Sequence, residues 1–549
     1  MNVNEAIAHI LKEEGVEYLF AYPLNPIIES AAEVGIRPIV VRQERVGLHM
    51  ADAISRTTSR NSVGVFCMQS GPGAENAFPG VAQAYADSVP IVVLPLGKDR
   101  GSTEHGPNFN ASHNYREITK SAEQASSPDA VPDALRRAFS GARNGRPRPT
   151  LVEIPRDLFS AELSTPITHE ATRTTRSAPD SHAVGKAADI LLDAEDPVIY
   201  AGQGVHYAEA WDDLRTFAEL LEAPVTTSLE GKSAFPEDHP LSLGTGGRTM
   251  PRTVPHFLDK ADLIFGIGCS FAKTAFGVTI PTDNTIVHAT LDPADVNSDV
   301  PADLAMIGDA SLTLQALNEE LGAKLEGEQR GRFDPVTDEI DKVYEEWMDE
   351  WKPLLTSDDV PLSPYRVIAD LMDTVDRPNT IITHDAGSPR DELSPFWETT
   401  APLTYIGWGK STQLGYGLGL AMGAKLAHPE KLCINVWGDA AIGMTGMDFE
   451  TAAREEIPIL SILFNNFSMA MEIEHMPVST ERYDSTDISG HYADVAEALG
   501  GYGERVETPE AIVPAIERGI QQTEDGVPAL LEFITTTEKV YSNEGAYLE

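Results

Sequence analysis

The stretch Trp437–Met469, WGDAAIGMTGMDFETAAREEIPILSILFNNFSM, decides how this chain folds. An apolar run, Leu432–Trp437, enters it and stops at Gly438-Asp439, and a second run, Ile457–Phe464, stops at Asn465-Asn466. Apolar residues between the runs recur at helical spacing, so the pattern indicates a strand, a helix and a second strand. Such a unit is normally a right-handed crossover of two parallel strands, whose carboxyl ends meet at one edge of the sheet. Open α/β sheets bind their ligands at this edge.

Two polar side chains, Asp439 and Asn466, follow these two strands. A carboxylate, an amide oxygen and a nearby backbone carbonyl are hard oxygen ligands that suit Mg²⁺, which completes its shell with water and phosphate oxygens. The pattern therefore predicts a diphosphate group held through a metal ion. For Gly438-Asp439 alone, the commoner interpretation is an aspartate in a turn, and asparagines that cap a loop are equally ordinary.

The first 160 residues alternate short apolar runs with helical stretches, which predicts a parallel sheet with helices on both faces. The expected strands are Glu17–Ala21, Pro38–Val41, Ser62–Met68, Pro90–Leu96 and Thr150–Ile154. Glu44 lies between the second strand and an expected helix, Arg45–Thr57. A carboxylate there is well placed for a cleft, although a glutamate that favours the helix dipole is the simpler interpretation from position alone.

Two further α/β regions follow. The second region covers 181–325, where Gly202-Gln203-Gly204 and Gly266-Ile267-Gly268 are too short for a full dinucleotide-binding fingerprint. The third region, 360–549, holds the opening stretch and follows a charged connecting helix. The predicted fold class is therefore α/β, with three doubly wound parallel-sheet domains at 1–163, 181–325 and 360–549.

The chain is strongly acidic, with 41 basic and 85 acidic residues and a formal net charge of −44. Such a surface repels nucleic acid and anionic membranes, so neither is an expected partner. The acidic residues are spread along the whole chain rather than gathered in a tail. This favours a halophilic protein, whose self-repulsion is screened by molar salt, where the Debye length is about 3 Å.

Two further features bound the class of protein. No apolar run is long enough to span a bilayer, and Met1–Gly15 has the pattern of an acidic amphipathic helix, so the expected location is the cytoplasm. Cys67, Cys269 and Cys433 lie in separate apolar segments without metal-ligand spacing. They predict buried reduced thiols and exclude a disulfide framework or a zinc site.

Gly438-Asp439 after one strand, with Asn465-Asn466 closing the next, resembles the thiamine-diphosphate motif. Enzymes that carry this motif include acetolactate synthase, pyruvate oxidase and benzoylformate decarboxylase. The family has Gly-Asp-Gly where this chain has Ala440 in third place, and alanine keeps the backbone amide but removes glycine's conformational freedom. Three more blocks resemble the family: Glu44 followed by His49-Met50-Ala51-Asp52, Ser70–Asn76 (SGPGAEN) and Ala84–Pro90 (AYADSVP).

The resemblance implies, in chain order, a pyrimidine-binding, a central nucleotide-binding-like and a diphosphate-binding domain. Glu44 would hydrogen-bond the aminopyrimidine of thiamine diphosphate and promote the imino tautomer that takes the proton from the thiazolium carbon. Its pKa is expected to be raised by burial. Asp439, Asn466 and the carbonyl of Ser468 would hold Mg²⁺. The other cofactor-binding residues so implied are Asn76, Gly387, Ser388, Gln413, Leu414, Gly438, Ala440, Ala441 and Met469.

Leu414 stands in Gln413–Leu418, which resembles a family block, and would wedge the cofactor into its bent shape. Without the resemblance it is a plain core leucine. His49 is expected to be a structural histidine that faces away from the strand end. The loops expected around the substrate depart from the commonest family members. Candidate substrate contacts there are Asn108, Asn110, His113 and, for a carboxylate, Lys410, with ordinary loop or surface residues as the alternative.

The resemblance covers nearly the whole chain and implies an acetolactate synthase-like enzyme, which decarboxylates a 2-oxo acid and transfers the acyl unit to a second carbonyl. A simple 2-oxo acid decarboxylase and a non-catalytic regulatory homologue are the alternatives. A homodimer or homotetramer is expected, in which Glu44 and Asp439 of each site come from different chains. FAD is left open, because related enzymes bind FAD, another nucleotide or nothing in the central domain.

Overall fold

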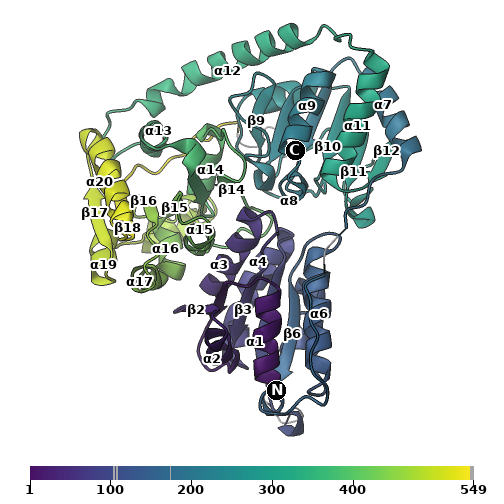
Figure 1. Cartoon of the computed structure of the whole chain (residues 1–549). Coiled ribbons are helices and arrows are strands. Elements are labelled where there is room, and N and C mark those ends of the chain that lie inside the picture. Colours follow the sequence, from purple (N-terminus) through teal and green to yellow (C-terminus); the bar gives the residue numbers. More distant parts are fainter. Residues whose placement is uncertain (103–105, 107–108, 173–174, 544–549) are drawn as a thin grey trace.

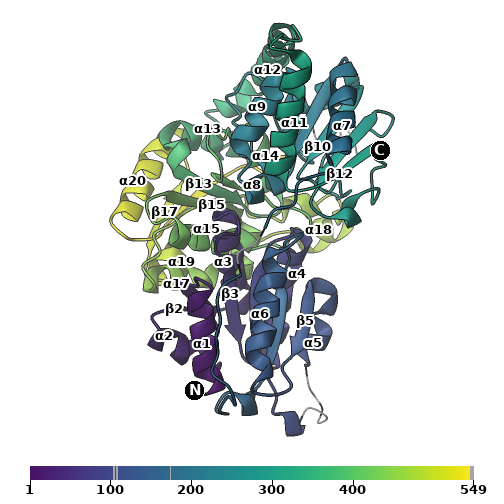
Figure 2. The same cartoon turned by 45° about the vertical axis from the view of Figure 1, so that its right-hand side comes forward.

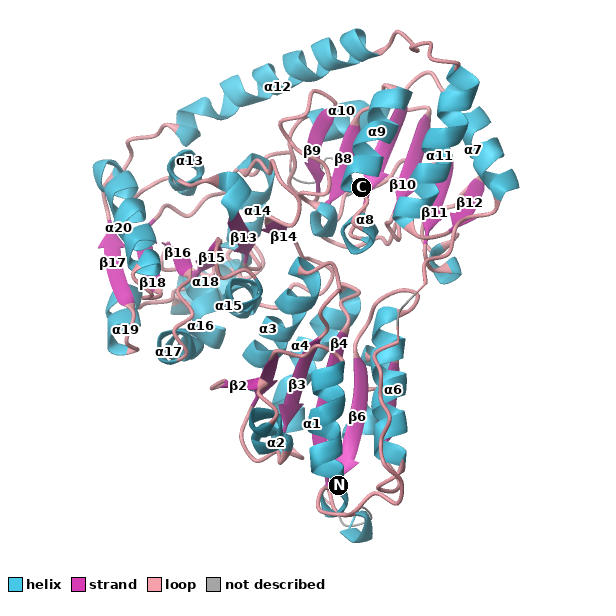
Figure 3. Cartoon of the chain, in the orientation of Figure 1, coloured by secondary structure: helices cyan, strands magenta, loops and turns pink. Residues whose placement is uncertain are grey.

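The computed structural model describes residues 1–549 except 103–105, 107–108, 173–174 and 544–549. Three parallel six-stranded sheets follow one another along the chain, each accompanied by helices (Figure 1 and Figure 3). The predicted fold class, three doubly wound α/β domains, is confirmed.

The first domain has the strand order β2-β1-β3-β4-β6-β5. Its strands are β1 (Tyr18–Ala21), β2 (Arg37–Val40), β3 (Gly64–Met68), β4 (Ile91–Gly97), β5 (Ser121–Gln124) and β6 (Thr150–Pro155). Its helices are α1 (Val3–Glu13), α2 (Ile27–Glu33), α3 (Glu44–Thr57), α4 (Pro72–Ala86), α5 (Ala111–Asn114) and α6 (Ala130–Arg143). Asn2 and Glu5 start α1 with a capping box, in which each side chain accepts a hydrogen bond from the other's backbone amide.

The second domain has the order β12-β11-β10-β7-β8-β9, which from the other edge is the 3-2-1-4-5-6 order of dinucleotide-binding folds. Its strands are β7 (Pro197–Ala201), β8 (Val225–Ser228), β9 (Ser242–Gly246), β10 (Leu263–Ile267), β11 (Thr285–Thr290) and β12 (Leu304–Ile307). Its helices are α7 (Ser181–Asp193), α8 (Gly204–Ala208), α9 (Trp211–Leu221), α10 (Thr253–Lys260) and α11 (Ala310–Leu325). A Cβ on Gly204 would lie 2.7 Å from the Cα of Gly268. The loops after β7 and β10 can therefore approach this closely only because both positions are glycine.

The third domain repeats the order of the first, as β14-β13-β15-β16-β18-β17. Its strands are β13 (Thr380–His384), β14 (Tyr405–Ile406), β15 (Leu432–Gly438), β16 (Leu460–Asn465), β17 (Tyr502–Val506) and β18 (Ala529–Ile534). Its helices are α13 (Pro364–Thr374), α14 (Ser388–Phe396), α15 (Tyr416–Ala427), α16 (Asp439–Thr445), α17 (Phe449–Arg454), α18 (Pro477–Tyr483), α19 (Tyr492–Ala498) and α20 (Ile512–Glu524). The opening stretch is confirmed as a crossover, because β15 and β16 pair in parallel.

Two helices join the domains. The long α12 (Phe333–Leu355) runs along the outside from the second domain to the third (Figure 1). Helix α3 packs against α15 and links the first domain to the third (Figure 2). Glycines allow this close packing: a Cβ on Gly423 would lie 2.4 Å from the carbonyl oxygen of Met50, and one on Gly419 would lie 2.5 Å from the Cβ of His49. One apolar cluster therefore runs through both domains.

The three cysteines are buried and form no disulfide, as predicted. Among the residues that the structure describes, no helix combines the length and the apolarity needed to cross a bilayer.

Candidate active site

Glu44 is the first residue of α3, just beyond β2. Its side chain is only 2% exposed. Burial raises the pKa of the carboxyl, while hydrogen bonds from its own backbone amide and from the Asn76 side chain oppose that rise. The start of α4 passes close by, because a Cβ on Gly73 would lie 3.4 Å from the Oε1 of Glu44. The structure therefore brings Glu44 and Asn76 together and raises the pKa of the Glu44 carboxyl.

Asp439, Asn466 and Ser468 converge at the carboxyl ends of β15 and β16. The backbone amide of Ser468 donates to Oδ2 of Asp439 at 3.2 Å and to Oδ1 of Asn466 at 3.0 Å. Asp439 is 4% exposed, and burial raises its pKa to about 6 although backbone amides, Ala440 among them, donate to it. Asp439 is buried, while Asn466 and Ser468 are partly exposed. This set of oxygen ligands fits a small hard cation, which would offset the cost of desolvating the Asp439 carboxylate.

Two helix starts adjoin at the same edge. Strand β13 pairs with β15, so α14, which starts at Gly387-Ser388, lies beside α16. A Cβ on Gly438 would lie 3.7 Å from Pro389. Gly387 has a φ of 86°, which requires glycine, whereas Ala440 lies inside α16 beside the buried Ala441 and is unstrained. Backbone amides at two neighbouring helix starts favour an anionic group such as a diphosphate.

Gln413 and Leu414 lie in a loop that Asp385 holds in place. The Asp385 carboxylate accepts hydrogen bonds from the amides of Gly415 at 2.8 Å and Gly417 at 3.0 Å. Burial raises the pKa of Asp385 to about 6 against these hydrogen bonds. Leu414 is half-buried against the apolar cluster shared by the first and third domains. Asp385 thus fixes the start of α15 to the end of β13.

The start of α3 faces the third domain within one chain. Arg45 donates to the carbonyl oxygen of Met444 at 2.8 Å, and the amide of Arg42 donates to Oδ1 of Asp448 at 2.8 Å. Deeper along α3, Nε2 of His49 lies 3.1 Å from Oε1 of Gln413. The edge of the first sheet that bears Glu44 is therefore held against the loop that bears Gln413 and Leu414.

The candidate substrate residues are scattered. Oδ1 of Asn110 caps α5 by accepting from the amide of His113 at 2.9 Å, and the His113 side chain is exposed. The amide of Lys410 donates to Oδ1 of Asp87 at 3.3 Å, and Lys410 also lines a cavity in the second domain. Asn108 lies outside the described residues. Asn110 therefore acts as a helix cap, and the backbone of Lys410 takes part in the contact between the first and third domains.

The other predicted cofactor residues include two that are open to solvent, Asn76 and Met469. The amide of Met469 donates to the carbonyl oxygen of Thr486 at 2.8 Å, which fixes the backbone beyond Ser468 while its side chain stays 40% exposed. These side chains remain available for a ligand or a second chain.

Two tyrosines at the site were not predicted from the sequence. Tyr115 donates to the carbonyl oxygen of Ala74, and burial, with the nearby charge of Glu44, raises its pKa. The hydroxyl of Tyr541 lies 3.0 Å from Oγ of Ser388. Both tyrosines belong to segments without a recognisable motif, so their place at the site could be seen only in the structure.

The second domain holds a cavity at the carboxyl ends of its strands. Tyr200 and Phe271 stack beside it, with their ring centroids 5.6 Å apart. Arg60 and Arg146 of the first domain and Lys410 of the third also line it. All three domains therefore contribute to the walls of this cavity.

Three family models match the chain in the order of its three sheets. They describe the N-terminal TPP binding domain (residues 1–120), the central domain (184–317) and the C-terminal TPP binding domain (385–533) of thiamine pyrophosphate enzymes. The chain belongs to the thiamine pyrophosphate enzyme family. Thiamine pyrophosphate is another name for thiamine diphosphate, so the resemblance seen in the sequence is confirmed.

The thiamine pyrophosphate enzymes similar to this chain include acetolactate synthases. The chain is 30% identical to the probable acetolactate synthase large subunit of Methanocaldococcus jannaschii, over 96% of this chain and 91% of the relative. It is 30% identical to the acetolactate synthase large subunit of Corynebacterium glutamicum, over 96% and 86%. It is 28% identical to the acetolactate synthase isozyme 3 large subunit of Escherichia coli, over 94% and 92%.

Proposed function

We propose that this chain is a thiamine diphosphate-dependent enzyme that decarboxylates a 2-oxo acid and transfers the acyl unit to a second carbonyl compound. The names of its acetolactate synthase relatives support this reaction class. The structural observation that supports it best is Glu44, a buried carboxyl at the edge of the first sheet whose pKa is raised by burial. An acid of this kind suits proton transfer with the cofactor ring.

Glu44, Asn76 and Leu414 would each have a separate role at the cofactor rings. Thiamine diphosphate, when bound, supplies the carbon nucleophile that adds to the 2-oxo acid and accepts the electrons released with CO₂. Glu44 would hold the proton shared with a ring nitrogen, and its hydrogen bond with Asn76 would orient the carboxyl. Leu414 would support the bend of the cofactor.

The diphosphate would lie at the edge of the third sheet. Asp439, Asn466 and the carbonyl of Ser468 would hold Mg²⁺, since their oxygen atoms suit a hard cation. The helix starts at Gly387-Ser388 and Gly438 would direct backbone amides towards the phosphate oxygens. Removal of divalent cations should therefore weaken cofactor binding.

We also propose that the active unit is a homodimer or homotetramer, with sites formed between chains. The exposed Phe467 and Met469, on either side of Ser468 in the chain, support a surface that a second chain covers. The contact between α3 and α15 already joins the first and third domains within one chain, so the origin of Glu44 and Asp439 at each site needs a direct test.

The reaction is tested by incubating the protein with pyruvate, thiamine diphosphate and Mg²⁺ at high KCl, and by measuring CO₂ and the organic products. We expect CO₂ together with acetolactate. Acetaldehyde in place of acetolactate would favour the simple decarboxylase. No CO₂ from pyruvate or from a panel of 2-oxo acids, with cofactor demonstrably bound, would favour a non-catalytic homologue.

The cavity of the second domain supports a second ligand, a nucleotide. Its position at the switch point of a 3-2-1-4-5-6 sheet is where such folds bind dinucleotides, and the cations Arg60, Arg146 and Lys410 suit phosphate groups. The test is to heat the purified protein until it releases any bound ligand and then to record the absorbance spectrum of the released ligand. A flavin spectrum would identify FAD, whereas absorbance of a purine alone would identify a colourless nucleotide.

A further inference from the structure

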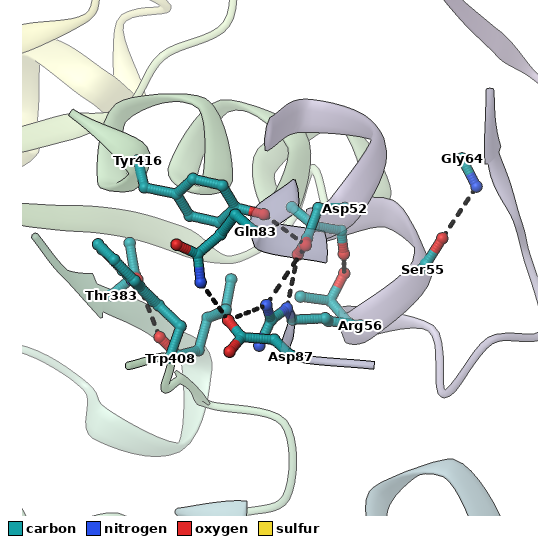
Figure 4. A network of polar contacts seen from close by, with 12 residues as sticks. Asp52, Ser55, Arg56, Gly64, Gln83, Asp87, Thr383, Trp408 and Tyr416 are labelled. Atoms are coloured by element: carbon teal, nitrogen blue, oxygen red, sulfur yellow. Dashed lines mark hydrogen bonds and ion pairs between the residues drawn. The ribbon is translucent and has the colours of Figure 1, made fainter. Parts of the chain in front are cut away.

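A buried ion cluster lies where α3 and α4 meet the third domain (Figure 4). Arg56 of α3 donates to Oδ1 of Asp52 at 2.5 Å and to Oδ2 of Asp87 at 2.9 Å. The three side chains are 6%, 0% and 0% exposed, respectively. One guanidinium thus lies between two carboxylates, and further hydrogen-bond donors are needed to satisfy them.

The third domain both supplies donors to this cluster and accepts from it. The Tyr416 hydroxyl donates to Oδ2 of Asp52 at 2.6 Å, and Arg56 donates to the carbonyl oxygen of Gly407 at 2.9 Å. The amide of Lys410 donates to Asp87 at 3.3 Å. The cluster is therefore bonded to the third domain at three separate points.

Gln83 of α4 adds a fourth link. Its amide nitrogen donates to Oδ2 of Asp87 at 2.7 Å, and its Oε1 accepts from the backbone amide of Gln413 at 3.3 Å. Gln83 is fully buried, so these bonds form away from solvent. The four links all fall on 407–416, the segment that carries Leu414.

This segment has little structure of its own. It runs from the end of β14 to the start of α15 and contains no helix or strand before Tyr416. Gly407 also packs closely against the second domain, since a Cβ at this position would lie 1.7 Å from the carbonyl oxygen of Leu229. The conformation of 407–416 is therefore determined by its contacts with the rest of the protein. A buried ion pair is weak evidence of stabilisation, because the cost of desolvation offsets the attraction between the charges. The positions that the cluster imposes on its partners are therefore more informative than its contribution to stability.

We propose that Arg56 is a positioning residue, which together with Asp52 and Asp87 sets the conformation of 407–416 and thereby places Leu414 and Gln413 against thiamine diphosphate. This rests on the proposed function, because it assumes that this segment contacts the cofactor. Arg56 itself touches neither cofactor nor substrate. It acts through Gly407, and through the two carboxylates that bind Tyr416 and Lys410.

The test uses R56K in the full-length holoenzyme. Lysine keeps the charge but cannot bond Asp52, Asp87 and Gly407 at once, because it lacks the planar fork of arginine. The dissociation constant of thiamine diphosphate is expected to rise about tenfold or more, and kcat at saturating cofactor to fall by a similar factor. The near-ultraviolet circular dichroism of bound cofactor should change as well, which a loss of folded protein alone would not cause.

R37K is the matched control. Arg37 also joins the first and third domains, through Glu455 at 3.1 Å, but it is half-exposed and distant in sequence from 407–416. It should bind cofactor and turn over as wild type does. R56K values equal to those of R37K, or losses that only follow the folded fraction, would overturn the proposal.

Y416F provides a second variant if R56K does not fold. It removes one hydroxyl and leaves the ion cluster intact, so a rise of about threefold in the cofactor dissociation constant is expected. A folded Y416F protein with unchanged affinity and kcat would also overturn the proposal. Wild-type turnover is measured first: its absence with cofactor bound would reject the proposed reaction, while the affinities would still test the positioning role.

Discussion

His49 and Gln413 belong to different domains, yet Nε2 of the histidine lies 3.1 Å from Oε1 of the glutamine. The His49 side chain is fully buried, and burial lowers its pKa well below the usual value, so the ring is neutral. Its Nδ1 finds no partner among the described residues. The sequence suggested a structural histidine, and the structure adds that this histidine holds a residue expected to contact the cofactor.

Replacing His49 with phenylalanine should separate these two roles. The ring volume and the packing on Tyr416, with centroids 4.0 Å apart, are kept, while the bond to Gln413 is lost. The thermal midpoint should stay equal or rise, since a buried unpaired nitrogen is removed. The dissociation constant of thiamine diphosphate, measured by calorimetry, should rise roughly 3- to 10-fold. Unchanged affinity would remove His49 from the site.

Replacing Glu44 with glutamine should leave cofactor binding within a few-fold of wild type but reduce kcat by about 10² or more. Glutamine has the shape of the protonated acid but cannot exchange a proton with the cofactor. Steady-state turnover and calorimetry on the same sample measure both quantities. E33Q, at an exposed position on α2, is the control. Undiminished turnover of E44Q would exclude Glu44 from the mechanism.

Mixing two inactive variants should show how chains share the sites. If Glu44 and Asp439 of one site come from different chains, a hybrid of E44Q and D439A chains contains one intact site. Random reassociation of dimers should then restore about one quarter of the wild-type rate. The variants are mixed after dissociation and assayed together. A mixture as inactive as its parents would show that one chain supplies both residues.

Asp448 should make stability depend on pH. It is 1% exposed, and burial raises its pKa from 3.8 to about 6. The folded state thus binds the proton more tightly than the unfolded state, so this stabilisation is complete below pH 4 and is lost as the pH rises towards 6 and beyond. The loss amounts to roughly 3 kcal/mol.

D448N cannot titrate and should escape this loss. Relative to wild type, its denaturant midpoint should improve between pH 4.5 and pH 7.5. D133N, at an exposed carboxylate, should follow wild type at both values. A difference between D448N and wild type that does not change with pH would show that Asp448 does not titrate in this range.

High salt should stabilise the protein. With a net charge of −44, self-repulsion is screened as the Debye length falls from about 10 Å at 0.1 M to about 3 Å at 1 M salt. The thermal midpoint, followed by fluorimetry, should rise by roughly 10 °C between 0.1 and 2 M KCl. Sucrose at equal osmolarity should give a smaller rise. A midpoint indifferent to KCl would reject the halophilic interpretation.

The centres of the sheets could be predicted because buried parallel strands are continuous apolar runs. The run Leu432–Trp437 became β15, and the expected helix 45–57 became α3 with one more residue. The edge strand β2 was predicted, but the edge strands of the third sheet gave no such signal. Strand β14 has two residues, and β17, YGERV, is half-buried and polar, so neither rises above loop patterns.

The candidate site was predictable where a single sheet edge collects its residues. Asp439 and Asn466 follow neighbouring strands, so topology alone brings them together. The cluster around Arg56 was not predictable, because it requires α3 to meet a segment more than 350 residues further along the chain. No local sequence pattern predicts such a contact. The family motifs identify α3 and the segment 407–416 separately but do not indicate that the two are in contact.

Helix α3 is buried almost throughout, and its outer face is covered by α15. Synthesis proceeds from the N-terminus, so the first domain can fold while this face is still bare. It stays bare until the ribosome has released residues 416–427, long after the first sheet is complete. The nascent first domain therefore exposes apolar surface during synthesis, and slowing translation before α15 should increase its aggregation.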